Sequence, residues 1–187
     1  FGLISGMETD VAMQRLINLQ QQTKFMTENV RDEMSEREKA NQIRRDSIRI
    51  LDQLNTVENR SVATMEQITF VMNQFASQAK LTNESIASMA ALSATLIEAG
   101  EEQGKGGRAL RMMYARLGAD INGSRKAVED LGIAVADNEG NMRALSDVLV
   151  DLAAAYHTMS GEEQTALAQQ VAGNRHYTRL IKLLENV

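Results

Sequence analysis

Residues 64–79 have the sequence TMEQITFVMNQFASQA. Thr64 and Gln67 have the spacing of a capping box, in which the glutamine side chain reaches back to the backbone of the capping residue. The apolar side chains that follow at helical spacing, on one face, are Met65, Ile68, Met72, Phe75 and Ala79. This stretch therefore predicts an amphipathic helix that begins at residue 65.

The chain on either side of this helix also favours α-helix. Between Met7 and Ala99 there is neither glycine nor proline, so the backbone chemistry does not force a helix to end. An unbroken helix of that length would run roughly 140 Å at about 1.5 Å per residue. We nevertheless expect a break near residues 55–64. We expect Thr82 or Asn83 to cap the next helix, and Gly100 to end it.

The first 60 residues predict an extended helix or an interrupted coiled coil. Leu16, Leu19, Met26 and Val30 keep an approximate heptad spacing, whose phase returns at Leu51 and Leu54. The seam positions between them hold Glu33, Arg37, Arg44 and Ser47, which a stable coiled coil would not place there. Residues 31–46 mix both signs of charge and predict a solvated helix. The predicted self-association faces consist of Leu16, Leu19, Met26, Val30, Leu51, Leu54, Met65, Met72 and Phe75.

Residues 61–187 predict a bundle of short helices. Ten of the twelve glycines lie between Gly100 and Gly173, where they separate short apolar stripes. Residues 133–135 alternate in character and predict a short extended segment that leads into a turn at Asp137–Gly140. Ser160 and Glu163 form a second capping box. Each apolar face is too small to be stable alone, so the helices should pack on one another. The predicted fold class is therefore all-α, with an extended helix followed by a helical bundle.

The composition favours no catalytic, metal or cofactor site. The chain has no cysteine, and its net charge of −5 supplies no electrostatic reason for tight binding to DNA or anionic membranes. Residues 100–107 only superficially resemble a phosphate-binding loop. His157 and His176 lack the spacing of a metal site or a general base. We predict that the chain is not an enzyme and has no cofactor. Since it begins at Phe1, we also expect it to be part of something longer.

From residue 51 onward, an ordered series of short motifs becomes recognisable. The segments are 51–59, 75–79, 97–100, 107–117, 131–137, 140–143, 145–152, 163–167, 173–175 and the pair Leu183–Leu184. In this order they resemble the core of bacteriophage tail tape measure proteins, over about three quarters of the chain. Ala144 departs from the pattern, where many relatives would have proline. The family-motif positions are Asn59, Gly100, Gly107, Leu110, Leu117, Leu131, Gly132, Asp137, Gly140, Asn141, Arg143, Leu152 and Gly173.

The resemblance implies a structural function in a phage virion. Family members are helix-rich chains that pack in several copies, expected as a trimer or hexamer, along the tail lumen, where chain length sets tail length. The implied partners are the tail tube, the tail-tip or baseplate hub, tail assembly chaperones in the host cytoplasm and, in some cases, the host envelope. No specific nucleic acid is implied, although the protein leaves the tube ahead of DNA. Two alternatives remain: a non-enzymatic helical adaptor that binds a partner helix, and a cell-wall hydrolase module.

Overall fold

The computed structural model describes residues 14, 17–18, 20–21, 24 and 29–186, and this part of the chain consists of helices joined by turns and loops, without strands. An isolated β-bridge joins Ala136 to Met142. The predicted all-α fold class is therefore confirmed. In chain order the elements are α2 Glu36–Glu58, α3 Met65–Asn73, α4 Ala76–Leu81, α5 Ile86–Glu98, α6 Gln103–Gly118, the short 3-10 helix η2 Ile121–Gly123, α7 Ser124–Glu129, α8 Leu145–Tyr156, α9 Gly161–Ala172 and α10 Tyr177–Leu184.

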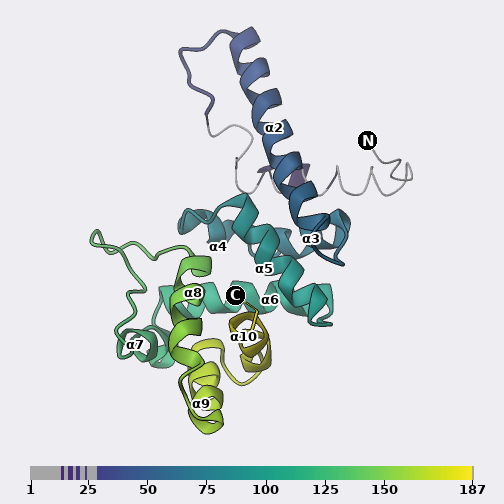
Figure 1. The fold of residues 1–187 in the computed structure, drawn as a ribbon. Helices are drawn as coiled ribbons and strands as arrows, with labels where there is room; N and C mark the ends of the chain where they lie inside the picture. Colours follow the sequence, from purple (N-terminus) through teal and green to yellow (C-terminus); the bar gives the residue numbers. More distant parts are fainter. Residues whose placement is uncertain (1–13, 15–16, 19, 22–23, 25–28, 187) are drawn as a thin grey trace.

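Helix α2 projects from a bundle formed by the helices that follow it (Figure 1). Its residues Ile50 and Leu54 are buried, and the helix contacts α5 and α3. The helix begins with a capping box of Ser35 and Glu38 and does not continue a heptad from upstream. Val30 lies outside any helix, and residues 31–35 are non-helical. The coiled-coil pattern is thus interrupted before Glu36, while Leu16, Leu19 and Met26 lie outside the described residues.

Within residues 29–85, which contain neither glycine nor proline, helices end at Glu58, Asn73 and Leu81. The first break lies in the predicted interval, and Thr64 caps α3 with the predicted capping box. The expectation that Thr82 or Asn83 caps α5 is wrong. The Thr82 hydroxyl donates back to the carbonyl of Ala79, and Asn83 adopts a left-handed conformation with φ of 53°. Ser85 caps α5 instead, because its hydroxyl accepts a hydrogen bond from Ser88 N–H.

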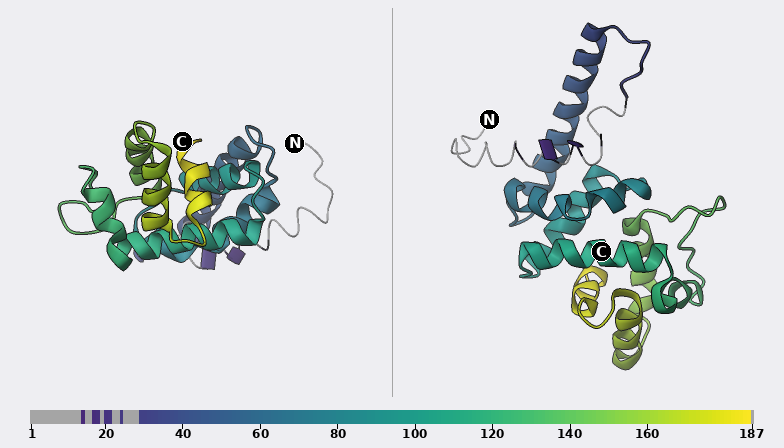
Figure 2. Two further views of the ribbon diagram at one scale, coloured as in Figure 1. Left: turned by 90° about the horizontal axis from the view of Figure 1, so that it is seen from below. Right: turned by 180° about the vertical axis from the view of Figure 1, so that it is seen from behind.

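Helix α6 lies at the centre of the bundle, where it contacts α3, α4, α5, α7, α9 and α10. Figure 2 shows it crossing the molecule between the α3–α5 layer and the α8–α10 layer. The largest fully buried side chains are Phe75, Leu54, Ile68, Met72, Met89, Leu96, Leu110, Met113, Leu117, Leu145, Leu149 and Leu152. The ring of Phe75 stacks on that of Tyr114, with centroids 5.9 Å apart. One contiguous apolar core therefore joins helices from α2, through Ile50, to α10, through Leu184.

Candidate assembly surface

The residues predicted to form self-association faces separate into two groups in the structure. Leu54, Met65, Met72 and Phe75 are buried in the core of the single chain, so an assembly contact through them would require the bundle to open. Leu51 and Val30 are partly buried, and Leu51 packs against the core. Leu16, Leu19 and Met26 lie outside the described residues. The role of all nine in self-association stays a prediction.

Helix α2 offers an exposed surface instead. Ile43 and Ile48 are 37% and 50% exposed although both are large and apolar. The same helix buries one acidic residue, Asp46, whose carboxylate accepts hydrogen bonds from the side-chain amides of Asn29 and Gln42 and pairs with Arg49 at 3.3 Å. Asp46 thereby holds residue 29 against α2.

The family-motif positions Asp137, Gly140, Asn141 and Arg143 build one turn. Asp137 Oδ1 accepts hydrogen bonds from the backbone N–H groups of Glu139 and Asn141, both at 2.9 Å. The hydrogen bonds from Asn141 and Glu139 to this carboxylate outweigh its slight desolvation and lower the pKa of Asp137. Gly140 has a φ of 86°, which glycine adopts without strain. The predicted turn is confirmed at residues 138–139, whereas the predicted extended segment 133–135 belongs to no strand and the bridge lies at Ala136 and Met142.

Arg143 ties this turn to the bundle. Its guanidinium donates to the carbonyl of Ala134 at 2.6 Å and pairs with Asp151 of α8 at 2.9 Å.

The remaining apolar motif positions divide between core and surface: Leu110, Leu117 and Leu152 are fully buried, whereas Leu131 is 39% exposed. Asn59 is the exposed C-cap of α2. Gly100, Gly132 and Gly173 have positive φ and follow α5, α7 and α9.

Gly107 allows two helices to approach closely. It is buried in α6, where a Cβ atom would lie 2.7 Å from Cβ of Gln74, the C-cap of α3. No side chain fits at that distance, so a glycine here brings the end of α3 against α6. The motif position thus has a packing reason.

This close approach leaves a polar groove along α6. The groove has a volume of about 520 Å³ and is lined by Asn73, Gln74, Ser77, Gln78, Arg108 and Arg111. All six side chains are polar, and none is a carboxylate. A neighbouring groove of about 720 Å³ shares Arg108 but includes Glu101 and Glu102. The groove of about 520 Å³, called the arginine groove below, therefore has the chemistry to bind an oxyanion.

A buried carboxylate joins three elements of the bundle. Glu84, in the turn before α5, is 1% exposed and accepts a hydrogen bond from the Tyr114 hydroxyl of α6 at 2.6 Å. It also accepts hydrogen bonds from the backbone N–H and the hydroxyl of Ser146, in the first turn of α8. A carboxylate at that position stabilises the N-terminal end of the helix. Burial, followed by the negative charge of Glu84, raises the pKa of Tyr114 far above its ordinary value.

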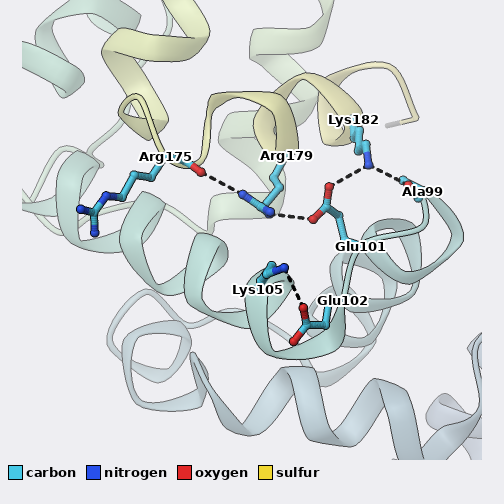
Figure 3. Close-up of polar contacts among 7 residues, drawn as sticks. All are labelled: Ala99, Glu101, Glu102, Lys105, Arg175, Arg179 and Lys182. Carbon is cyan, nitrogen blue, oxygen red and sulfur yellow. Dashed lines mark hydrogen bonds and ion pairs between the residues drawn. The ribbon is translucent and has the colours of Figure 1, made fainter.

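A second acidic residue attaches α10 to the turn between α5 and α6 (Figure 3). Glu101 accepts hydrogen bonds from Arg179 at 2.8 Å and from Lys182 at 2.7 Å, and Lys182 also donates to the carbonyl of Ala99. Burial alone would raise the pKa of Glu101, but the Lys182 hydrogen bond and the charge of Arg179 outweigh it and lower the pKa. Neither Glu84 nor Glu101 was identified as a contact residue from the sequence, where no local pattern distinguishes them from exposed glutamates.

Two arginines satisfy the carbonyl groups at helix ends. Arg116 donates to the carbonyls of Gln170 and Val171 near the end of α9, and Arg125 donates to those of Leu117 and Gly118 at the end of α6. A cation there also interacts favourably with the helix dipole. Both arginines were missed from the sequence because the groups they bind are defined only by the tertiary fold.

The two histidines lie in different environments. His157 is exposed at the C-cap of α8, with its ring edge-on to Tyr156. His176 precedes α10, and burial together with Arg179, Arg108 and Arg175 lowers its pKa. Among the described residues, no three potential metal ligands of the His, Cys, Asp and Glu types come together. The described helices also include none that is both long and apolar enough to cross a membrane.

Comparison with known proteins places this helical architecture in a family. A search of solved structures finds no match to the chain. The family of phage-related minor tail proteins, a domain found in tape measure proteins, matches residues 4–173. That match includes α2 through α9 and every family-motif position named above. Because it extends over well more than half of the sequence, the chain belongs to the family of phage-related minor tail proteins.

Proposed function

We propose that the chain is a segment of a tape measure protein, which packs in several copies in the tail lumen, sets tail length and leaves the tube before the DNA. Its family makes it a structural component of the phage tail and hence of the virion. The observation that carries the proposal is α2, a 23-residue helix that projects from the bundle. At about 1.5 Å per residue such a helix spans roughly 35 Å, so helix length is converted into axial distance at a constant rate.

The bundle has a different part in this proposal. Helices α3 to α10 fold back on one another, so additional residues there do not add length along one axis. We assign axial distance to α2. The bundle would then make contacts with other copies, in a trimer or hexamer, and with the tube, the hub or the assembly chaperones. Its exposed apolar and charged positions supply surfaces for such contacts.

An insertion experiment tests the proposal. Two extra copies of residues 37–54 placed in tandem within α2 add 36 residues, or ten helical turns, so the buried side of the helix keeps its direction. A ruler predicts tails longer by roughly 54 Å in electron micrographs, because each inserted residue adds about 1.5 Å.

The matched control places the same 36 residues in the exposed turn between Glu139 and Gly140 of the same parent protein. Those residues lie in a side loop, so tail length should not change. Equal lengthening by both insertions would mean that residue number and not axial helix length is measured. Normal tails of unchanged length from the α2 insertion would favour the alternative, a helical adaptor.

A further inference from the structure

The arginine groove contains the guanidinium groups of Arg108 and Arg111, of which Arg108 also interacts electrostatically with Glu102. Helix α6 carries Lys105, Arg108, Arg111 and Arg116 and no acidic residue. Lys105 pairs with Glu102, and Arg116 binds the end of α9. Within residues 29–186, neither Arg108 nor Arg111 forms an ion pair. They are exposed one helical turn apart and line the same groove. Arginine binds carboxylates and phosphates through paired N–H donors.

The neighbouring side chains suit the same ligand chemistry. Gln74, Ser77 and Gln78 line the same groove as the two arginines. All three can donate hydrogen bonds to a carboxylate. The position of Gln74 is set by the close contact with Gly107, so one wall of the groove is fixed by backbone packing. The site is thus built from the α3–α4 connection and α6 together.

We propose that the arginine groove binds the acidic loop between α7 and α8 of a second copy of this chain, with Glu139 as the principal contact. The loop between α7 and α8, residues 130–144, contains Asp130, Asp137 and Glu139, and its one cation, Arg143, pairs with Asp151 of α8. Figure 1 shows the segment after α7 projecting from the bundle as a loop. The inference rests on the proposed function in one respect, the presence of several copies in one tail.

Glu139 is the carboxylate of this loop that remains available. Asp137 uses its carboxylate within the turn, and Asp130 pairs with Lys126 at 2.8 Å. Glu139 is exposed, and its contact with the Asn141 amide is long, at 3.5 Å. The groove belongs to α3, α4 and α6 and the loop to a different part of the surface. Two copies that make this contact reciprocally form a two-fold dimer, and copies that make it in one direction form a head-to-tail chain. Repeated head-to-tail contacts produce a ring or a filament.

A protein carboxylate fits the groove better than nucleic acid does. Two arginines can pair with one or two carboxylates, whereas tight binding to a nucleic acid requires many phosphate contacts. The chain also has a net charge of −5, which repels a polyanion at long range. An acidic loop, by contrast, carries only a few negative charges, which the two arginines of the groove can neutralise.

Charge reversal followed by sedimentation velocity tests this inference on the 187-residue chain. Arg111→Glu and Glu139→Arg should each raise the dissociation constant for self-association roughly tenfold or more, because each places like charges together. In a mixture, the groove of each variant meets a loop of opposite charge on the other variant, so both groove–loop pairings between unlike chains are attractive and hetero-association should recover. Raising the salt from about 0.1 M to about 1 M should weaken association of the unmodified chain, since the screening length falls from about 10 Å to about 3 Å.

The controls carry the same charge changes at exposed positions outside both surfaces: Arg60→Glu for the groove and Asp52→Arg for the loop. Both should associate like the unmodified chain. Circular dichroism of each variant checks that it is folded. The inference is overturned if the unmodified chain stays monomeric, if the controls weaken association equally, or if mixing restores nothing. It is also overturned if Arg111→Glu abolishes binding to duplex DNA while self-association persists. None of these outcomes alters the insertion experiment, which tests the ruler separately.

Discussion

Replacing Gly107 with alanine places a methyl group where the structure has no room for it. The new Cβ would lie 2.7 Å from Cβ of Gln74 and 2.9 Å from both its Cδ and Oε1. The far atoms of the glutamine side chain can rotate away, but its Cβ is attached to the backbone at the end of α3. Relief of the overlap therefore requires α3 and α6 to separate by several tenths of an ångström, in a region where Met72 and Leu110 are fully packed.

The adjacent Gly106 supplies a matched control within the same helix. A Cβ there would lie 3.5 Å from Cδ1 of Leu96 and 3.6 Å from its Cβ, which are ordinary contacts. Gly106→Ala should therefore stabilise the chain by about 1 kcal/mol through helix propensity. Gly107→Ala gains the same propensity but incurs overpacking at the upper end of about 1–3 kcal/mol. The net loss is about 2 kcal/mol, so the two variants should differ by about 3 kcal/mol.

Thermal and urea unfolding, followed by far-ultraviolet circular dichroism, measure this difference. For a domain of this size, about 1 kcal/mol corresponds to a change in Tm of about 2–4 °C. Gly107→Ala should lower Tm by roughly 4–8 °C, and Gly106→Ala should raise it by roughly 2–4 °C. If Gly107→Ala proves as stable as Gly106→Ala, then α3 does not approach α6 as described. The packing explanation of this motif position would then be wrong.

Two further predictions concern ionisable groups. Raising the pH should ionise Tyr114 only as the chain unfolds, because burial and Glu84 raise the pKa of its hydroxyl in the folded state. The contribution of Tyr114 to the free energy of unfolding is therefore fully present below pH 10, the ordinary pKa, and decreases as the pH rises above it. The absorbance of the Tyr114 phenolate should then appear together with the loss of the circular dichroism signal. In Tyr114→Phe, the part of the absorbance change that accompanies unfolding should decrease. A Tyr114 hydroxyl that titrates while the chain is still folded would refute the contact with Glu84. Lowering the pH from about 6 to about 3 should destabilise the chain in part through Glu101, because the fold lowers the pKa of this carboxyl group. Its charged form stabilises the folded chain at pH values above the ordinary pKa of 4.5. This stabilisation is lost as the pH falls through the lower pKa of the folded state. Urea unfolding should show a smaller acid effect in Glu101→Gln than in the exposed control Asp52→Asn, and equal effects would contradict the prediction.

The features that the sequence predicted correctly depend on neighbouring residues. The capping boxes at Thr64 and Ser160 both form, because the two partners of each box are three residues apart. Gly100 follows α5 with a left-handed φ of 75°, as a glycine after a helix commonly does. The turn at 137–140 forms through hydrogen bonds within five residues. Local chemistry of this kind is readable without knowledge of the fold.

The features that the sequence did not reveal depend on partners far along the chain. Glu84 binds Tyr114 and Ser146, which are 30 and 62 residues away, and Glu101 binds Lys182 at a separation of 81 residues. The sequence also does not determine what an apolar helix face packs against. Met65 and Met72 have the spacing of a contact surface, but that spacing is the same whether the contact is with another copy or with the chain's own core. The structure places them in the core.

The positive-φ residues and the long-range polar contacts occur at the same junctions. A residue with positive φ ends each of three segments, and a charged side chain lies beside it. Asn83 is followed by Glu84, Gly100 is followed by Glu101, and a Cβ atom added at Gly173 would lie 3.5 Å from Nη1 of Arg116. A left-handed turn reverses the chain, but it leaves the direction of the next helix adjustable. The buried carboxylates and Arg116 supply the missing constraint, since each binds a helix that arrives from elsewhere in the sequence. The geometry of the bundle, and with it the shape of the arginine groove, therefore depends on a few charged groups at helix junctions as much as on the apolar core.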